Sequence, residues 1–306
     1  MEITAQRICG DTWCVIEPKA IVPYYRLNEK EIILLDSGCL LQGELEAWLA
    51  EQKLRGKAIL TTHDHWDHVA AHQALQQVHG AKIYLPKIEA ALHATDLGHL
   101  TAHANGNLKK IHNFFEPFSY RVDEEIGLED GVLDVCGVPF SVVHTPGHSV
   151  DHVCYITPDQ VLYVGDTLMS EELLRRTKLS YAASHEEDIA SKKKLRQYDC
   201  KAYVLAHGSI EQDIGALIDQ NIDYVCRRAE EVWRLITEPM SMEHILCKLW
   251  RYFALRDGMY YKNLEMGNMI RSLVQYLVST GRLECRYYDG VDYYAHSREQ
   301  EETTWN

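Results

Sequence analysis

The segment ILTTHDHWDHVAAH, residues 59–72, constrains this chain most. It places three histidines and two aspartates within six residues, directly after an apolar run. Gathering so many ionisable groups at the end of a buried strand is costly unless they are paired or bind cations. Neutral imidazoles and carboxylates are ligands for zinc and similar divalent ions. The segment therefore predicts a metal site in a loop between a strand and a helix.

Four ligands from one loop cannot complete two metal sites, so further ligands are expected at other strand ends. His148 in TPGHS, Asp166 in VGDT and His207 in LAHG each follow an apolar stretch. Any one of them alone is more often a capping or surface residue, and the loop cluster is what favours a metal role. Strands and helices alternate through residues 30–86, and hairpins follow from residue 131, which predicts a mixed α/β fold.

In order and spacing, the motifs LLDSG, HDHWDH, TPGH, GD and AHG resemble the metallo-β-lactamase superfamily over about residues 10–210. The resemblance implies a four-layer αβ/βα sandwich that carries the motifs along one edge. It also implies two divalent metal ions, zinc first, with iron or manganese as alternatives. The implied ligands are His63, His65 and His148 for the first metal, Asp67, His68 and His207 for the second, and Asp166 for both. Asp36 in LLDSG is implied to orient the ligand loops without binding metal.

A two-metal site predicts hydrolysis, because a bridging water loses a proton near neutral pH and becomes the nucleophile. We expect Asp67 and Asp166 to be the catalytic carboxylates. True β-lactamases of this fold typically have cysteine or serine where Asp166 stands, so the resemblance favours the glyoxalase II, lactonase and ribonuclease-like branch. The leading hypothesis is a small ester-like substrate, either a thioester or a lactone.

Two alternatives remain open. One is a metal-dependent nuclease or phosphodiesterase, or an RNA-binding protein. The other is a persulfide dioxygenase with a single iron. Pocket walls are expected from residues 90–118 and 169–187, where Tyr181 and His185 are candidates for substrate contact.

A proline at residue 239 after a long helical pattern predicts a boundary between a catalytic domain, 1–237, and a C-terminal domain, 238–306. Helical patterns near residues 242–255 and 265–279, followed by strands around Asp289-Gly290, predict a small winged-helix-like α+β domain. A domain of this kind suggests nucleic-acid binding. However, the net charge of the chain is −14, and this segment has nearly equal numbers of basic and acidic side chains. Both features disfavour nucleic-acid binding. We expect a small-molecule substrate, with the C-terminal domain in a packing or homodimer role.

The nine cysteines include no C-x-x-C pair, which predicts reduced thiols and a cytoplasmic protein. The sequence has no run of apolar residues long enough to predict a membrane span, and its start does not resemble a secretory signal.

Overall fold

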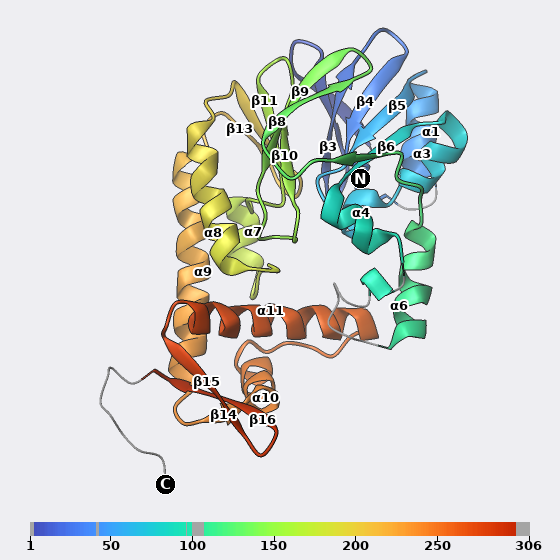
Figure 1. Ribbon diagram of the computed structural model, residues 1–306. Coiled ribbons are helices and arrows are strands. Elements are labelled where there is room, and N and C mark those ends of the chain that lie inside the picture. Colours follow the sequence, from blue (N-terminus) through green and yellow to red (C-terminus); the bar gives the residue numbers. More distant parts are fainter. Residues whose placement is uncertain (1–2, 41–42, 96, 100–106, 298–306) are drawn as a thin grey trace.

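The computed structural model describes residues 3–40, 43–95, 97–99 and 107–297. Two β-sheets, of seven and six strands, lie face to face with helices on their outer sides (Figure 1). The mixed α/β fold predicted from the sequence is confirmed.

The first sheet carries its seven strands in chain order. They are β1 (Thr4–Cys9), β2 (Thr12–Ile16), β3 (Ile21–Arg26), β4 (Glu31–Leu35), β5 (Arg55–Leu60), β6 (Lys82–Pro86) and β7 (Glu124–Ile126). The pairs up to β4 are antiparallel and those from β4 onward are parallel. Parallel strands end at one edge of a sheet, and ligand sites form beyond such carboxyl ends. Asp36 and the histidine loop follow β4 and β5 at this edge.

The second sheet has the order β13-β12-β11-β10-β9-β8. Its strands are β8 (Gly131–Val135), β9 (Val138–His144), β10 (Val153–Ile156), β11 (Val161–Gly165), β12 (Ala202–Leu205) and β13 (Ile210–Glu211). Only β11 and β12 pair in parallel. His148, Asp166 and His207 follow β9, β11 and β12, so this sheet supplies the remaining predicted ligands from its own strand ends.

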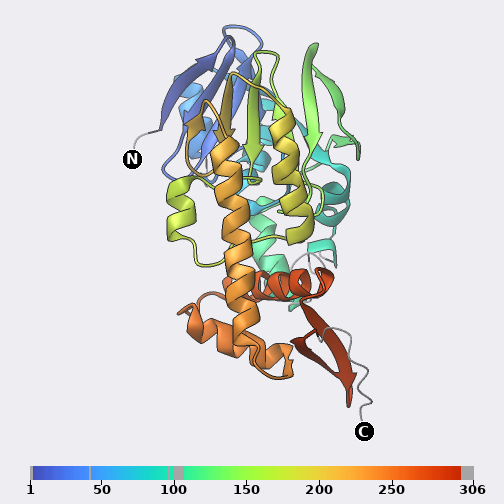
Figure 2. The ribbon, with the colours of Figure 1, turned by 90° about the vertical axis from the view of Figure 1, so that its left-hand side faces the viewer.

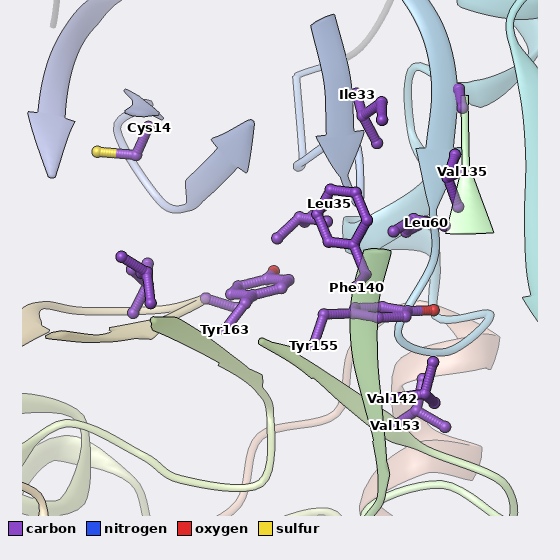
Figure 3. Close-up of a cluster of buried hydrophobic side chains, with 14 of the residues drawn as sticks. Cys14, Ile33, Leu35, Leu60, Val135, Phe140, Val142, Val153, Tyr155 and Tyr163 are labelled. Carbon is purple, nitrogen blue, oxygen red and sulfur yellow. The ribbon is translucent and has the colours of Figure 1, made fainter. Parts of the chain in front are cut away.

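Apolar side chains fill the space between the sheets. Phe140, Tyr155 and Tyr163 are almost completely buried there (Figure 3). Helices α1 (Glu44–Glu51) and α3 (His72–His79) lie on the first sheet, and α9 (Gly215–Leu235) lies on the second. Further helices before α9 include α2 (Trp66–Val69), α4 (Lys87–His93), α6 (Leu108–Phe115), α7 (Glu171–Arg176) and α8 (His185–Lys194), with short 3₁₀ turns at Glu116–Phe118 and Leu195–Gln197. In the described part of the chain, none of the helices has the length and apolar character needed to cross a membrane.

The C-terminal module, residues 240–296, packs on the far end of α9, which continues out of the sandwich (Figure 2). It comprises β14 (Met240–Ser241), α10 (Met242–Tyr252), α11 (Tyr260–Ser279), β15 (Leu283–Tyr288) and β16 (Val291–His296), with the sheet order β14-β16-β15. One apolar cluster joins Val232 of α9 to Leu249 of α10 and Leu273 of α11. The module therefore shares its core with the end of α9.

Helix α11 begins at Tyr260, five residues before the start indicated by the sequence pattern. Tertiary contact explains the difference, because Tyr261 is buried and stacks on Phe114 of α6 with ring centroids 4.0 Å apart. The helix crosses below the sandwich at the end where the metal motifs lie (Figure 1). The C-terminal module is thereby brought next to the predicted site.

Candidate metal centre

The fold brings all seven predicted metal ligands together at one edge of the two sheets. They form two groups, and within each group one donor atom per residue lies within 4.8 Å of the others. The first group contains His63, His65, His148 and Asp166, and the second contains Asp67, His68 and His207. The division follows the sequence-based assignment, with Asp166 counted in the first group.

Asp166 contacts both groups. Its Oδ2 lies 3.3 Å from Nε2 of His148 in the first group. Its Oδ1 lies 3.4 Å from Nε2 of His68 and 3.6 Å from Nε2 of His207 in the second. The two oxygens of this carboxylate thus face different ligand groups. In this position the carboxylate could serve as a ligand to two neighbouring cations.

The histidines of the first group are neutral. Burial lowers the pKa of His63 and His65, and it lowers the pKa of His148 to about 3. A neutral imidazole is the form that binds a metal ion. Nε2 of His148 also lies 3.0 Å from Nδ1 of His65, so the two rings converge.

The residues present fit divalent cations. Nε2 of His63 is buried and has no hydrogen-bond partner among the described residues, and Nε2 of His68 is buried with Oδ1 of Asp166 3.4 Å away, outside hydrogen-bond geometry. A buried polar atom without a partner costs about 1–3 kcal/mol. A metal ion at these nitrogens would remove that cost, and the imidazole and carboxylate donors are those that zinc, iron and manganese accept.

The histidines of the second group are oriented through their Nδ1 atoms. Nδ1 of His68 lies 2.8 Å from Oδ2 of Asp36, and Nδ1 of His207 lies 2.8 Å from the carbonyl oxygen of Lys19. Each Nε2 is thereby left to face the site. Burial favours the neutral rings, but neighbouring carboxylates together outweigh it. Asp166 and Asp36 raise the pKa of His68, and Asp166 and Asp67 raise that of His207 to about 9. Metal binding here therefore displaces protons.

Asp36 holds the site together. It is fully buried and adopts a left-handed backbone conformation with φ of 62°. Its carboxylate accepts hydrogen bonds from the backbone and side chain of Thr62, at 2.6 and 2.8 Å, and from the hydroxyl of Tyr163 at 2.8 Å. These contacts, with the one to His68, tie the histidine loop to the second sheet. This is the geometry that the predicted orienting role needs.

His152 also supports the site, although the sequence did not single it out. The ring is fully buried, and its Nε2 accepts the backbone N–H of Asp166 at 3.2 Å. Its Nδ1 lies 2.9 Å from the hydroxyl of Thr145. The signal available in the sequence is the second histidine of HSVDH, four residues after His148.

Asp64, His93 and His99 form a further group with metal-compatible spacing. Both nitrogens of His93 are already engaged, Nδ1 with Asp64 at 2.9 Å and Nε2 with the carbonyl of Tyr120 at 3.1 Å. The hydroxyl of Tyr120 donates to the same carboxylate at 2.7 Å. These hydrogen bonds explain why Asp64 and His93 lie together. They attach the histidine loop to α4 and to the segment that carries Tyr120.

A cavity of about 200 Å³ opens onto the metal groups. One wall comes from the segment around α7, one from α8 and one from α11. The lining includes Tyr181, Asp188, Lys192, Tyr261, Glu265 and Met269. The wall expected from residues 169–187 is present. Of the described residues in 90–118, none lines this cavity, because the apolar side chains of α6 pack against Tyr261.

The two candidates for substrate contact lie in different places. Tyr181 lines the cavity, with its ring centroid 5.0 Å from that of His65, and burial raises the pKa of its hydroxyl so that it stays protonated. His185 is not among the described residues that line the cavity. Its buried ring lies 6.2 Å from that of Tyr276 on α11. The structure thus brings Tyr181 to the site and leaves His185 outside it.

Comparison with known proteins agrees with the motifs. The family model of the metallo-beta-lactamase superfamily matches residues 21–207. Hydroxyacylglutathione hydrolase from Rhizobium meliloti (strain 1021) is 36% identical over 113 residues, which cover 37% of this chain and 34% of that protein. Atrochrysone carboxyl ACP thioesterase from Aspergillus fumigatus is 24% identical over 209 residues, which cover 66% of this chain and 55% of that protein. The matched part of the chain thus spans about a third of the length of the first relative and just over half of the length of the second.

A solved structure shares the fold over nearly the whole chain. The beta-lactamase domain protein from Burkholderia ambifaria superposes with a TM-score of 0.70 at 16% identity, covering 96% of this chain and 94% of that one. The coverage reaches beyond the sandwich into the C-terminal module.

Proposed function

This chain belongs to the metallo-β-lactamase superfamily, and we propose that it is a dinuclear metal-dependent hydrolase of a small ester-like substrate, a thioester before a lactone. The observation that carries the proposal is Asp166, whose two oxygens face the two ligand groups at the floor of a small cavity. The two named relatives are hydrolases, one of them named a thioesterase, which supports the thioester.

Two divalent ions held by the seven ligands, zinc first with iron or manganese as alternatives, would supply a hydroxide nucleophile near neutral pH and polarise the scissile carbonyl. In the net reaction the acyl C–S bond breaks, a C–O bond to the oxygen of water forms, and an acid and a thiol leave. Without metal Asp67 is ionised, since the hydrogen bond from His207 and the charge of His68 outweigh burial and lower its pKa. Once metal binding has displaced the protons of the two histidines, the positive charge of the cations would keep this carboxyl ionised. The carboxylate of Asp67 accepts a hydrogen bond from the attacking water.

Tyr181 has a separate role in this proposal. Its protonated hydroxyl faces the cavity next to His65. It is placed to donate a hydrogen bond to the carbonyl oxygen of the substrate, where negative charge develops during attack.

The cavity walls favour a small substrate over a nucleic acid. Helix α11 covers the site and contributes the Glu265 carboxylate to the wall, and the chain has a net charge of −14. Both features oppose a polyphosphate. The nuclease alternative therefore has less support.

The proposal also covers the C-terminal domain and the location of the protein. The order of α9, β14, α10, α11 and the β15–β16 hairpin supports a winged-helix-like C-terminal domain from residue 238. This domain would serve as a wall of the site and, in a homodimer, as a contact surface. All nine cysteines are free thiols, which supports a cytoplasmic location.

The test combines metal analysis with a substrate panel. Protein expressed without added metal is analysed for zinc, iron and manganese, stripped with a chelator, and assayed with a thioester, a lactone and a phosphodiester before and after each metal is returned. We expect about two equivalents of metal and thioester hydrolysis that follows metal content. His63→Ala should lose both, whereas His244→Ala, at an exposed position on α10, should lose neither. A single iron would favour the dioxygenase, phosphodiester cleavage alone would favour the nuclease, and absence of metal would overturn the mechanism.

A further inference from the structure

Lys192 is a buried cation in the wall of the cavity. It lies on α8 and is 5% exposed. Its ammonium donates a hydrogen bond to Asp188, one turn earlier on the helix and also buried. Within the described part of the chain Asp188 is its single hydrogen-bond partner, although an ammonium carries three donors. Two donors therefore remain for a group inside the cavity.

The position of Lys192 is fixed relative to the metal centre. The backbone N–H groups of Ala183 and Ser184 donate to the carbonyls of His148 and Gly147 at 3.1 and 3.0 Å. A Cβ at Gly147 would lie 2.1 Å from the backbone nitrogen of Asp188, so only glycine permits this close approach. The loop that carries His148 and the start of α8 thus form one block.

Lys192 shares the cavity with the metal centre. Its side chain, His148 and Asp166 all line the same small cavity. The ammonium therefore lies close to the first ligand group. A substrate whose scissile carbonyl lies at the metal centre would place the next few atoms of its acyl chain near Lys192.

We propose that Lys192 binds a carboxylate on the acyl part of the substrate, so that the enzyme selects thioesters of dicarboxylic acids. This inference rests on the proposed thioester hydrolysis. A charged hydrogen bond between ammonium and carboxylate satisfies donors that would otherwise stay buried without partners. The cavity of about 200 Å³ is smaller than the about 300–1,000 Å³ of pockets for drug-sized ligands, so it holds an acyl group and not a whole thiol carrier.

The surrounding carboxylates limit the ligand to one negative charge. Asp188 already offsets part of the charge of Lys192, and Glu265 faces the same cavity from α11. A doubly charged group at this wall, such as a phosphate, would be repelled by these carboxylates. A single carboxylate is the anion that the wall accommodates.

The experiment compares two thioesters of N-acetylcysteamine that differ only in charge, the succinyl thioester and its neutral succinamoyl counterpart. With the metal-loaded wild type we expect kcat/KM to favour the succinyl thioester by about 10- to 100-fold, the range for hydrogen bonds to charged groups. Lys192→Met should reduce that ratio to about 1. Because this change strands Asp188, the double variant Asp188→Asn with Lys192→Met is measured as well, and it should give the same ratio with normal folding. Lys193→Met, at the exposed neighbouring position, should keep the wild-type ratio.

Calorimetric titration with succinate separates this inference from the proposed function. Binding to the wild type and to Lys193→Met, with loss in the double variant, supports the role of Lys192 even if no thioester is hydrolysed. Hydrolysis of both thioesters with equal kcat/KM overturns the selectivity and leaves the hydrolase intact. Absence of succinate binding to the wild type also overturns the inference.

Discussion

The metal centre and the walls of its cavity are built in different ways. The metal ligands lie in loops that follow strands or, for Asp67 and His68, on the short helix α2 that follows such a loop, and each belongs to a short sequence motif. The walls come from α8 and α11, which lie far from the histidine loop in the chain and reach the cavity through tertiary packing. The chemistry of the site is thus local in sequence, whereas its selectivity depends on how distant helices dock.

The forces that hold the two regions differ as well. Asp36 accepts a hydrogen bond from His68, and His152 accepts one from the backbone of Asp166, which fixes these two ligands. The α11 wall is held by apolar contacts, among them Tyr261 on Phe114. A lost hydrogen bond at the centre leaves a buried polar group without a partner, but an altered apolar contact repacks gradually. Substitutions at the centre should therefore have larger effects than substitutions in the wall.

The largest effect is expected for Asp166→Asn. An amide offers one oxygen and no charge, so it cannot serve both ligand groups. We expect hydrolysis to fall by more than about 100-fold, the upper range for loss of a residue that only supports a ligand. Metal content should fall in the same sample. Asp219→Asn, on the exposed side of α9, is the control, and retention of two metals by Asp166→Asn would contradict the bridging role.

A smaller effect is expected for Asp36→Asn. The carboxylate accepts four hydrogen bonds, from Thr62 twice, from His68 and from Tyr163, and an amide cannot accept them all with the same charge. Loss of such support costs about 10- to 100-fold in activity or metal affinity. Metal titration alongside kcat measures it. A loss as complete as that of Asp166→Asn would show that Asp36 does more than orient the ligands.

The difference between the two regions also explains what the sequence could and could not predict. The motifs around His63, His148 and Asp166 identify ligands because each residue directly follows a strand whose apolar pattern is visible. Lys192 and Glu265 gave no such signal, since each lies among ordinary helical residues. Whether these two residues line the cavity depends on which face of each helix points toward it. In addition, α11 begins earlier than its sequence pattern indicates, because Tyr261 packs on α6.

In the wall, Met269→Trp tests the role of α11 in selectivity. Met269 lines the cavity, and the larger indole would occupy space that the acyl group needs. We expect KM for a succinyl thioester to rise by about 10-fold, in the range for a misfit of one or two methylenes, with metal content unchanged. Met259→Trp, at a position 69% exposed, is the matched control. An unchanged KM would remove α11 from the substrate site.

The smallest effect concerns His185, which the structure places outside the cavity. Both of its ring nitrogens are buried and find no hydrogen-bond partner in the described part of the chain, and burial lowers its pKa to about 3. In the unfolded chain the pKa returns to about 6.5, so the unfolded state takes up the proton first as pH falls. The stability that the neutral ring contributes is present above pH 6.5 and is lost as pH falls toward 3, about 1.4 kcal/mol of it by pH 5.5.

His185→Phe removes this titration and keeps a ring in the same space. Between pH 7.5 and pH 5.5 the wild type should lose about 3 °C more in Tm than His185→Phe does. Scanning calorimetry of both proteins measures the difference, with His244→Phe at an exposed position as the control. An equal loss in His185→Phe and wild type would mean that His185 takes up its proton in the folded protein as readily as in the unfolded chain. In that case His185 would again be a candidate for a polar role near the site. The surroundings of the metal centre would then be less apolar than the structure indicates.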